Sequence, residues 1–176
     1  KFNVNLKIIV ACNTLLGGRR ITKKFSKLKE LINIKNNVNI NLINCDGEPE
    51  NFFKNYEIKS SKLASIVAIP DQHHFKWIKS LITQKVPILA VKPLTLNLQD
   101  SIELTNLARQ LKVPAFVEFH KRYDKQLRYA RDVFNSNELG NLLYSYTEYT
   151  QKKSIPEKTF KKWSDKTNIF SYLGVH

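Results

Sequence analysis

The chain has 176 residues, of which 42% are hydrophobic, enough for a buried core in one domain or in one domain and part of another. The net charge of +14 comes mostly from lysines spread along the chain, with no arginine-rich cluster, so we do not expect nucleic acid as a partner. We expect no membrane span and no signal peptide, and therefore a cytoplasmic protein. Cys12 and Cys45 lack zinc-ligand spacing, which predicts two buried thiols and no metal site.

Strands and helices alternate along the first part of the chain. Apolar runs predict strands at residues 6–12, 38–43, 64–69, 86–91 and 113–119. Helical spacing between them predicts helices at 19–32, from 49 through 53, at 74–82 and between 97 and 111. The expected helix N-terminal residues are Pro49, Asp71, and either Asn97 or Asp100. This order predicts an α/β fold with a Rossmann-like, doubly wound parallel sheet over residues 1–118.

The pattern changes after Phe119. Asp124 is expected to begin a helix that turns its apolar side chains inward, namely Leu127, Ala130, Val133 and Phe134. Alternating apolar and polar residues at 143–149 predict a half-buried antiparallel strand. Because one strand and one helix cannot bury themselves, residues 119–176 are expected to be an incomplete α+β domain that packs on the first domain or on another subunit.

Lys92 occupies a position at which chemistry is expected. It follows the fourth predicted strand directly and is itself followed by Pro93. In open parallel sheets, ligands bind outside the carboxyl ends of the strands. Lys92 is therefore the first candidate for a reactive group, the alternative being a solvated lysine after a strand.

Short motifs add a resemblance to a known family. They lie at residues 69–74 (IPDQHH), 91–93 (VKP), 119–124 (FHKRYD), 139–141 (LGN) and 172–176 (YLGVH). Their order and spacing resemble the glucose-fructose oxidoreductase / inositol dehydrogenase (Gfo/Idh/MocA) family of nucleotide-dependent sugar and polyol dehydrogenases. The resemblance extends from about residue 62 to residue 176, and most of the family's C-terminal sheet domain is not in this sequence.

The resemblance implies an NAD(P)-dependent oxidoreductase of sugar metabolism that acts on a sugar, polyol or sugar-nucleotide hydroxyl, in a chain that can form a homo-oligomer. By matching position, Lys92 would polarise the reacting oxygen, His176 would be the acid/base, and Tyr172 would stand where the family has an Asp. Arg122 would contact the substrate. The residues implied along the cofactor are Pro70, Asp71, His74, Val91, Lys92 and Pro93.

Two departures favour a rival interpretation. Val91 replaces the family's Glu, and Tyr172 replaces its Asp. A catalytically inactive relative, acting as a nucleotide or sugar sensor or as a protein-interaction module, would tolerate both changes.

Residues 1–62 allow two registers. If residues 6–12 form the first Rossmann strand, Asp46 ends the second strand, accepts the adenine ribose hydroxyls and favours NAD over NADP. If residues 6–12 form the second strand, the first strand is missing. No G-x-G-x-x-G motif follows residues 6–12, and the residues expected to stand in for it are Ala11, Asn13, Gly17 and Gly18.

Overall fold

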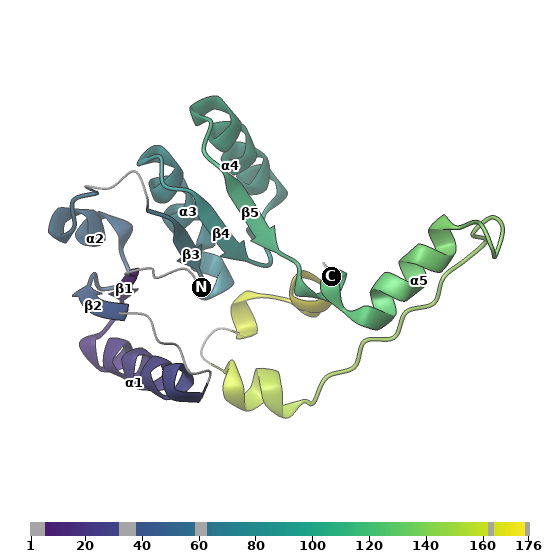
Figure 1. Ribbon diagram of the computed structural model, residues 1–176, viewed down its shortest axis with the longest axis horizontal. Helices are drawn as coiled ribbons and strands as arrows, with labels where there is room; N and C mark the ends of the chain where they lie inside the picture. Colours follow the sequence, from purple (N-terminus) through teal and green to yellow (C-terminus); the bar gives the residue numbers. More distant parts are fainter. Residues whose placement is uncertain (1–5, 32–37, 59–62, 162–163, 175–176) are drawn as a thin grey trace. The chain divides into compact units, whose positions relative to one another are not determined.

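A computed structural model of the chain describes residues 6–31, 38–58, 63–161 and 164–174. Figure 1 shows the elements along the chain. The chain divides into two compact units, residues 1–62 and residues 63–176, and each is described by itself.

The first unit is built on two parallel strands. Strand β1 (Leu6–Cys12) pairs with β2 (Val38–Asn44), with Cys12 opposite Asn44 at the carboxyl end. Helix α1 (Leu15–Leu31) connects the strands, and helix α2 (Pro49–Asn55) follows with Pro49 in its first turn, as predicted. In one predicted register these two segments are the first and second Rossmann strands, and in the other they are the second and the next strand. Both registers place them side by side, so the pairing of β1 with β2 does not distinguish the registers.

The two glycines after β1, Gly17 and Gly18, lie inside a helix that begins before residue 19, where the sequence predicts its start. Helix α1 begins at Leu15, and the Thr14 hydroxyl oxygen accepts a hydrogen bond of 3.1 Å from the Gly17 N–H. This cap lets the helix begin about one turn earlier than its apolar pattern indicates. A Cβ on Gly18 would lie 2.9 Å from Cys12 Sγ and 3.2 Å from the Leu42 methyl groups, so Gly18 permits the close packing of α1 on both strands.

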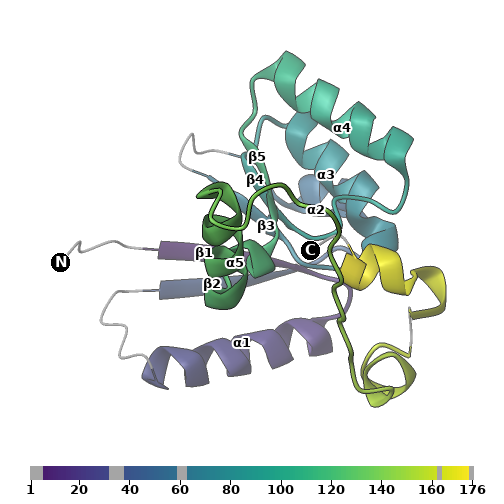
Figure 2. The same cartoon turned by 90° about the vertical axis from the view of Figure 1, so that its right-hand side faces the viewer.

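The second unit contains a three-stranded parallel sheet in the order β3-β4-β5, formed by β3 (Ser65–Val67), β4 (Ile88–Val91) and β5 (Ala115–Glu118). The short 3₁₀ turn η1 (Asp71–His73) leads into α3 (His74–Thr83), and α4 (Leu98–Leu111) connects β4 to β5. Helices α3 and α4 lie side by side along this sheet (Figures 1 and 2). The largest buried aliphatic side chains of this core are Ile78, Ile82, Val86 and Leu104.

Helix caps in the second unit were predicted with mixed success. Asn97 caps α4, because its Oδ1 accepts hydrogen bonds from the Gln99 and Asp100 N–H groups. Asp71 was wrongly predicted to cap α3: the η1 turn separates it from that helix, whose N-cap is His73. The Asp71 carboxylate is buried instead and bonds to a distant residue.

The chain after β5 forms η2 (His120–Tyr123), α5 (Lys125–Asn135), η3 (Ile155–Thr159), η4 (Ser164–Lys166) and η5 (Phe170–Gly174). Asp124 caps α5 as predicted and accepts from the Gln126 N–H. The predicted burial of the apolar face of α5 is wrong, since Leu127 and Phe134 are 49% and 45% exposed.

The strand predicted at residues 143–149 is also absent from this described stretch. These residues form no ladder, and Leu143 and Tyr144 are 90% and 85% exposed. A strand needs a neighbouring strand to satisfy its backbone groups, and no described segment pairs with this one.

The predicted α/β class with Rossmann-like parallel strands is confirmed, and the five strands in the described ranges are distributed over two sheets. The domain boundary expected at residues 118/119 stays a prediction, separate from the contact-based division at 62/63. Of the helices in the described ranges, none combines the length and the apolar character needed to cross a membrane. Cys12 and Cys45 are free and buried, as predicted.

Candidate functional site

Polar side chains gather where β3, β4 and β5 reach their carboxyl ends. Lys92 follows β4 directly, Asp71 lies shortly after β3, and Glu118 is the last residue of β5. Parallel pairing brings these strand ends to one edge of the sheet, and the register places Val91 opposite Glu118. The position of Lys92 at this edge is the one that the sequence predicts.

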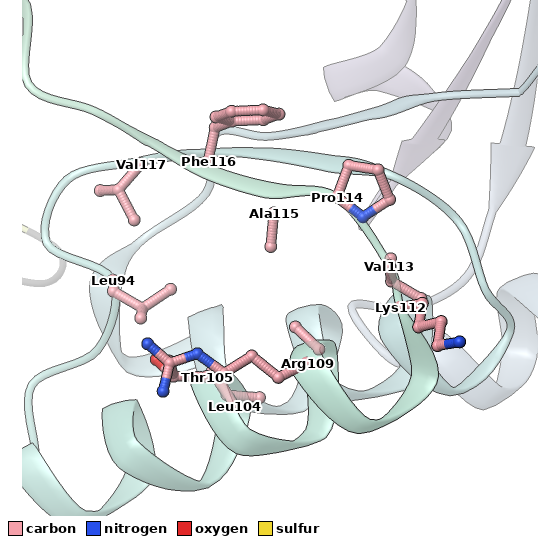
Figure 3. A pocket seen from close by; sticks show the side chains of 11 residues that line it. Leu94, Leu104, Thr105, Arg109, Lys112, Val113, Pro114, Ala115, Phe116 and Val117 are labelled. Atoms are coloured by element: carbon pink, nitrogen blue, oxygen red, sulfur yellow. The ribbon is translucent and has the colours of Figure 1, made fainter.

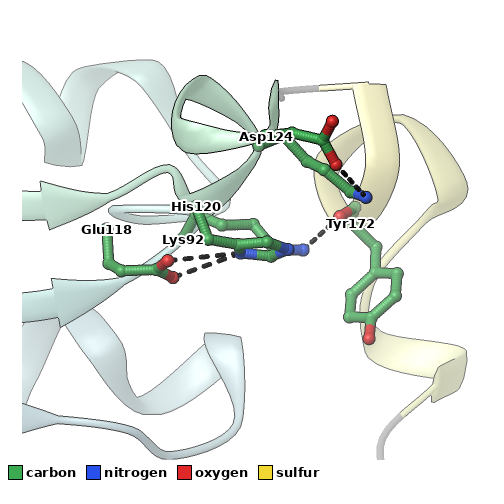
Figure 4. A network of polar contacts seen from close by, with 6 residues as sticks. Lys92, Glu118, His120, Asp124 and Tyr172 are labelled. Carbon is green, nitrogen blue, oxygen red and sulfur yellow. Dashed lines mark hydrogen bonds and ion pairs between the residues drawn. The ribbon is translucent and has the colours of Figure 1, made fainter. Parts of the chain in front are cut away.

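Lys92 points toward Tyr172 in the C-terminal segment of the described chain (Figure 4). The residue is 7% exposed, and its Nζ donates a hydrogen bond to the main-chain carbonyl of Tyr172 in η5. The same Nζ lies 3.7 Å from the centroid of the Tyr172 ring, a cation–π contact. Burial lowers the pKa of Lys92 below its ordinary value, whereas the carboxylates of Asp71 and Glu118 act in the opposite direction.

Tyr172 was predicted as a catalytic residue, and the structure shows what it presents to Lys92. The contacts use its carbonyl oxygen and its ring face, and its hydroxyl points away from the lysine in Figure 4. The ring also packs edge-on against Phe160, with centroids 5.6 Å apart. Tyr172 therefore holds the ammonium group in place, and its catalytic role stays a prediction.

Asp71 is tied to the same C-terminal segment. Asp71 is 6% exposed, and its Oδ2 accepts a hydrogen bond of 3.0 Å from the Thr167 hydroxyl. Thr167 lies between η4 and η5, so the ends of β3 and β4 both contact residues 164–174. Sequence reasoning missed Thr167, because nothing local marks a partner that is 96 residues from Asp71.

His74 joins the two loops that lead from β3 and β4. It is completely buried, with Nδ1 2.8 Å from the Pro93 carbonyl oxygen and Nε2 3.0 Å from the Ile69 carbonyl oxygen. The predicted cofactor contact of His74 is untested. In this conformation its imidazole positions Pro93, and thereby Lys92, without reaching the surface.

Glu118 and His120 form a polar pair at the end of β5. His120 Nδ1 lies 3.3 Å from Oε1 and 3.4 Å from Oε2 of Glu118 (Figure 4). The side chain of His120 is 54% exposed and that of Glu118 is 33% exposed. Neither His120 nor Glu118 is among the site residues predicted from the sequence. The position of Glu118 at the end of a predicted strand was the available signal.

The remaining predicted residues of this unit have different surroundings. The Arg122 guanidinium stacks on the Phe119 ring, with Cζ 4.6 Å from the centroid, and Arg122 is exposed. Pro70 and Val91 are half-buried, Pro93 is buried, and the Lys92–Pro93 peptide is cis. His176 lies outside the described residues.

The predicted cofactor residues of the first unit surround the end of β1. Ala11 and Asn13 are exposed, and the Asn13 amide oxygen lies near Gly47. Asp46 follows β2 with a positive φ of 49°, and its Oδ1 accepts a hydrogen bond from the Asn44 amide. The helix N-terminus of α1 and an exposed carboxylate are thus both present in this unit, which are the two features that bind dinucleotide phosphates and ribose in Rossmann folds.

A cavity of about 540 Å³ lies between α4 and β5 (Figure 3). Its lining is mostly apolar, with Arg109 and Lys112 as the charged members. None of the residues predicted for the reaction or the cofactor lines it, so it is separate from the polar edge of the sheet.

Comparisons with known proteins identify the matching part of the chain. Residues 48–119 match the family model described as oxidoreductase family, NAD-binding Rossmann fold. Glucose-6-phosphate 3-dehydrogenase of Bacillus subtilis is 26% identical over 117 residues, which cover 63% of this chain and 33% of that protein. Inositol 2-dehydrogenase of Corynebacterium glutamicum is 32% identical over 81 residues, which cover 46% of this chain and 24% of that protein.

A solved structure supports the fold. An NAD-binding protein from Listeria innocua superposes with a TM-score of 0.55 at 13% identity, covering 98% of this chain and 52% of that one. The chain spans 33% and 24% of the lengths of the two dehydrogenases above. The resemblance seen in the motifs is therefore confirmed over residues 48–119, which match the model of an oxidoreductase family with an NAD-binding Rossmann fold.

Proposed function

We propose that the protein is an NAD(P)-dependent oxidoreductase that transfers a hydride between a nicotinamide cofactor and a hydroxyl-bearing carbon of a sugar, polyol or sugar nucleotide. The observation that carries this proposal is the position of Lys92. It is a buried lysine of lowered pKa at the carboxyl end of a parallel strand, within the residues that match an NAD-binding family.

Lys92 would act on the reacting oxygen. The nicotinamide, when bound, accepts the hydride of the carbinol carbon but no proton. An adjacent group must therefore manage the hydroxyl proton. Lys92 would donate a hydrogen bond to the oxygen, which requires the substrate to take the place of the Tyr172 carbonyl as acceptor.

Residues of the first unit would hold the cofactor. The N-terminus of α1 would face the diphosphate, flanked by Ala11, Asn13 and Gly17, and Gly18 would allow the helix to approach the strands. Asp46 would accept the ribose hydroxyls, which favours NAD over NADP because a 2′-phosphate would be repelled. Pro70, Asp71, Val91 and Pro93 would line the remainder of the cofactor.

The other roles also stay proposals. His176 would be the acid/base and Arg122 would contact the substrate, as the motifs imply. A homo-oligomer and a cytoplasmic location are expected from the sequence and await measurement.

A second candidate is a catalytically inactive relative that binds a nucleotide or a sugar derivative. The specific observation in its favour is that Lys92 is almost fully buried against Tyr172, with Val91 in place of an acid beside it. Such a protein would bind the cofactor but leave its substrate unchanged.

Titration with NADH and NADPH, followed by turnover assays on a polyol and sugar panel, separates the candidates. We expect binding of NADH by the wild-type protein and a loss of turnover of at least about 100-fold in Lys92→Ala. Lys125→Ala, at the exposed start of α5, is the matched control. Failure to bind either nucleotide at millimolar concentration excludes the dehydrogenase, and binding without any turnover favours the inactive relative.

A further inference from the structure

The cavity between α4 and β5 has a lining that fits an apolar ligand (Figure 3). The most buried part of this lining consists of Leu104, Ala108 and Val113, which are 1%, 7% and 7% exposed. The volume of about 540 Å³ falls within the range of about 300–1,000 Å³ that is usual for small-molecule sites. The hydrophobic effect favours the transfer of an apolar chain from water into such a space.

Arg109 is the charged side chain that faces this space. In Figure 3 its guanidinium extends along α4 toward Leu94 and Thr105, whereas the Lys112 amine points away from the cavity. Among the described residues, no carboxylate lines the cavity and none forms an ion pair with Arg109. A guanidinium beside apolar carbon and without an acidic partner attracts an anion, and its planar fork matches the two oxygens of a carboxylate.

The outer edge of β5 adds main-chain donors to the same cavity. The Ile88 N–H of β4 donates a hydrogen bond of 3.0 Å to the Pro114 carbonyl oxygen. Because alternate residues of a parallel strand turn their main-chain groups to opposite edges, Ala115 and Val117 direct their N–H groups away from β4. No described strand pairs with that edge, and both residues line the cavity. The N–H groups at an open sheet edge also favour an anion.

We propose that this cavity is a binding site for an aliphatic carboxylate of the fatty-acid type. The aliphatic chain lies on the buried part of the lining, and the carboxylate binds the Arg109 guanidinium at the Leu94 end of the cavity. None of the residues proposed for the cofactor or the reaction lines this site. The inference therefore goes beyond the proposed function and is tested separately from it.

The first experiment uses the wild-type protein. Isothermal titration calorimetry with octanoate, below its micelle concentration, is compared with the same titration with octanol, a ligand of equal chain length without a charge. We expect saturable one-to-one binding of octanoate with a submillimolar Kd. Octanol should bind more weakly by about 10-fold or more, because the charge-assisted hydrogen bond is lost. Absence of saturable octanoate binding at millimolar concentration overturns the inference, and so does equal affinity for the two ligands.

The second experiment locates the carboxylate with charge variants. Arg109→Gln should weaken the binding of octanoate by about 10-fold and leave that of octanol unchanged. Lys112→Gln and Arg128→Gln are the matched controls, since the Lys112 amine points away from the cavity and Arg128 lies on α5, outside it. Both controls should bind octanoate as the wild type does. Unchanged binding in Arg109→Gln overturns the inference. Equal weakening in all three variants indicates a general attraction to the positive net charge and also overturns it.

The third experiment locates the aliphatic chain. The Ala115 methyl group points toward α4 in Figure 3, so the ring of Ala115→Phe should fill the cavity and abolish the binding of both ligands. Urea unfolding shows whether this variant folds. A wild-type measurement covers the case in which it does not: an octanoate analogue with a diazirine in its chain, photolysed and mapped by peptide mass spectrometry, should label α4 or β5. Unchanged binding in folded Ala115→Phe, or labelling confined to other parts of the chain, overturns the inference.

Discussion

The Lys92 ammonium lies over the ring of Tyr172, 3.7 Å from its centroid, and donates a hydrogen bond to the carbonyl of the same residue. These residues are 80 positions apart in the sequence. Their contact joins the predicted reactive lysine to η5, the last described element of the chain. The contact compensates in part for the burial of the ammonium group, because both the carbonyl and the ring face are electron-rich.

The ring of Tyr172 is expected to matter more to stability than its hydroxyl. Tyr172→Phe keeps the face beneath Lys92 and the contact with Phe160, whereas Tyr172→Leu removes both. We expect Leu to be less stable than Phe by about 0.5–2 kcal/mol in urea unfolding. Equal stabilities would contradict the cation–π contact. A turnover lost in Tyr172→Phe at normal stability would instead support the predicted catalytic role of the hydroxyl.

Alkaline pH is expected to stabilise the wild-type protein relative to Lys92→Met. Burial lowers the pKa of Lys92 in the folded state, so between that pKa and the unfolded value of about 10.4 the unfolded chain binds more protons. The free energy of unfolding therefore rises with pH through this window. Below the folded-state pKa, Lys92 is charged in both states and the full cost of burying its charge lowers the stability of the folded protein. Urea unfolding at a series of pH values measures the difference, and parallel curves for the two proteins would show that the pKa is not lowered.

Gly18→Ala is expected to weaken the packing of α1 on its strands. The new Cβ would lie 2.9 Å from Cys12 Sγ, and overpacking of this kind typically costs about 1–3 kcal/mol. Gly17→Ala is the matched control, because its Cβ would meet only the Thr14 hydroxyl at 3.2 Å and alanine favours the helix. In a double-mutant cycle, adding Cys12→Ala to Gly18→Ala should recover part of the lost stability. If the two substitutions change the free energy of unfolding additively, the contact between the new Cβ and Cys12 Sγ is not the cause of the loss.

His74→Leu is expected to destabilise the second unit by about 1–3 kcal/mol, since the buried imidazole that lies between the Ile69 and Pro93 carbonyl oxygens, and its hydrogen bond, are lost. His74→Gln should cost less, because its amide can donate to one of them. Thermal unfolding measures the stabilities of these two variants and of a control, His73→Leu, which changes the neighbouring histidine and leaves the contacts of His74 in place. A His74→Leu protein as stable as the wild type would mean that water or a shifted loop satisfies both carbonyls.

Local rules succeeded where the decisive contacts are local. Pro49, Asn97 and Asp124 begin or cap helices because each acts within a few residues of its own position. The same kind of reasoning failed at Asp71, whose partner Thr167 is 96 residues away. The inward face predicted for α5 failed for a related reason, since burial needs a second surface that the sequence pattern does not supply.

The sequence by itself determined the alternation of strands and helices, the family resemblance and the place of Lys92 after a strand, because periodicity and motif order are properties of the chain alone. The tertiary structure decided which side chains meet at that place. Parallel pairing set Glu118 beside Val91, and the return of residues 164–174 brought Thr167 to Asp71 and Tyr172 to Lys92. Such contacts depend on the three-dimensional path of the backbone, so a candidate lysine became a buried, partnered group only in the folded chain.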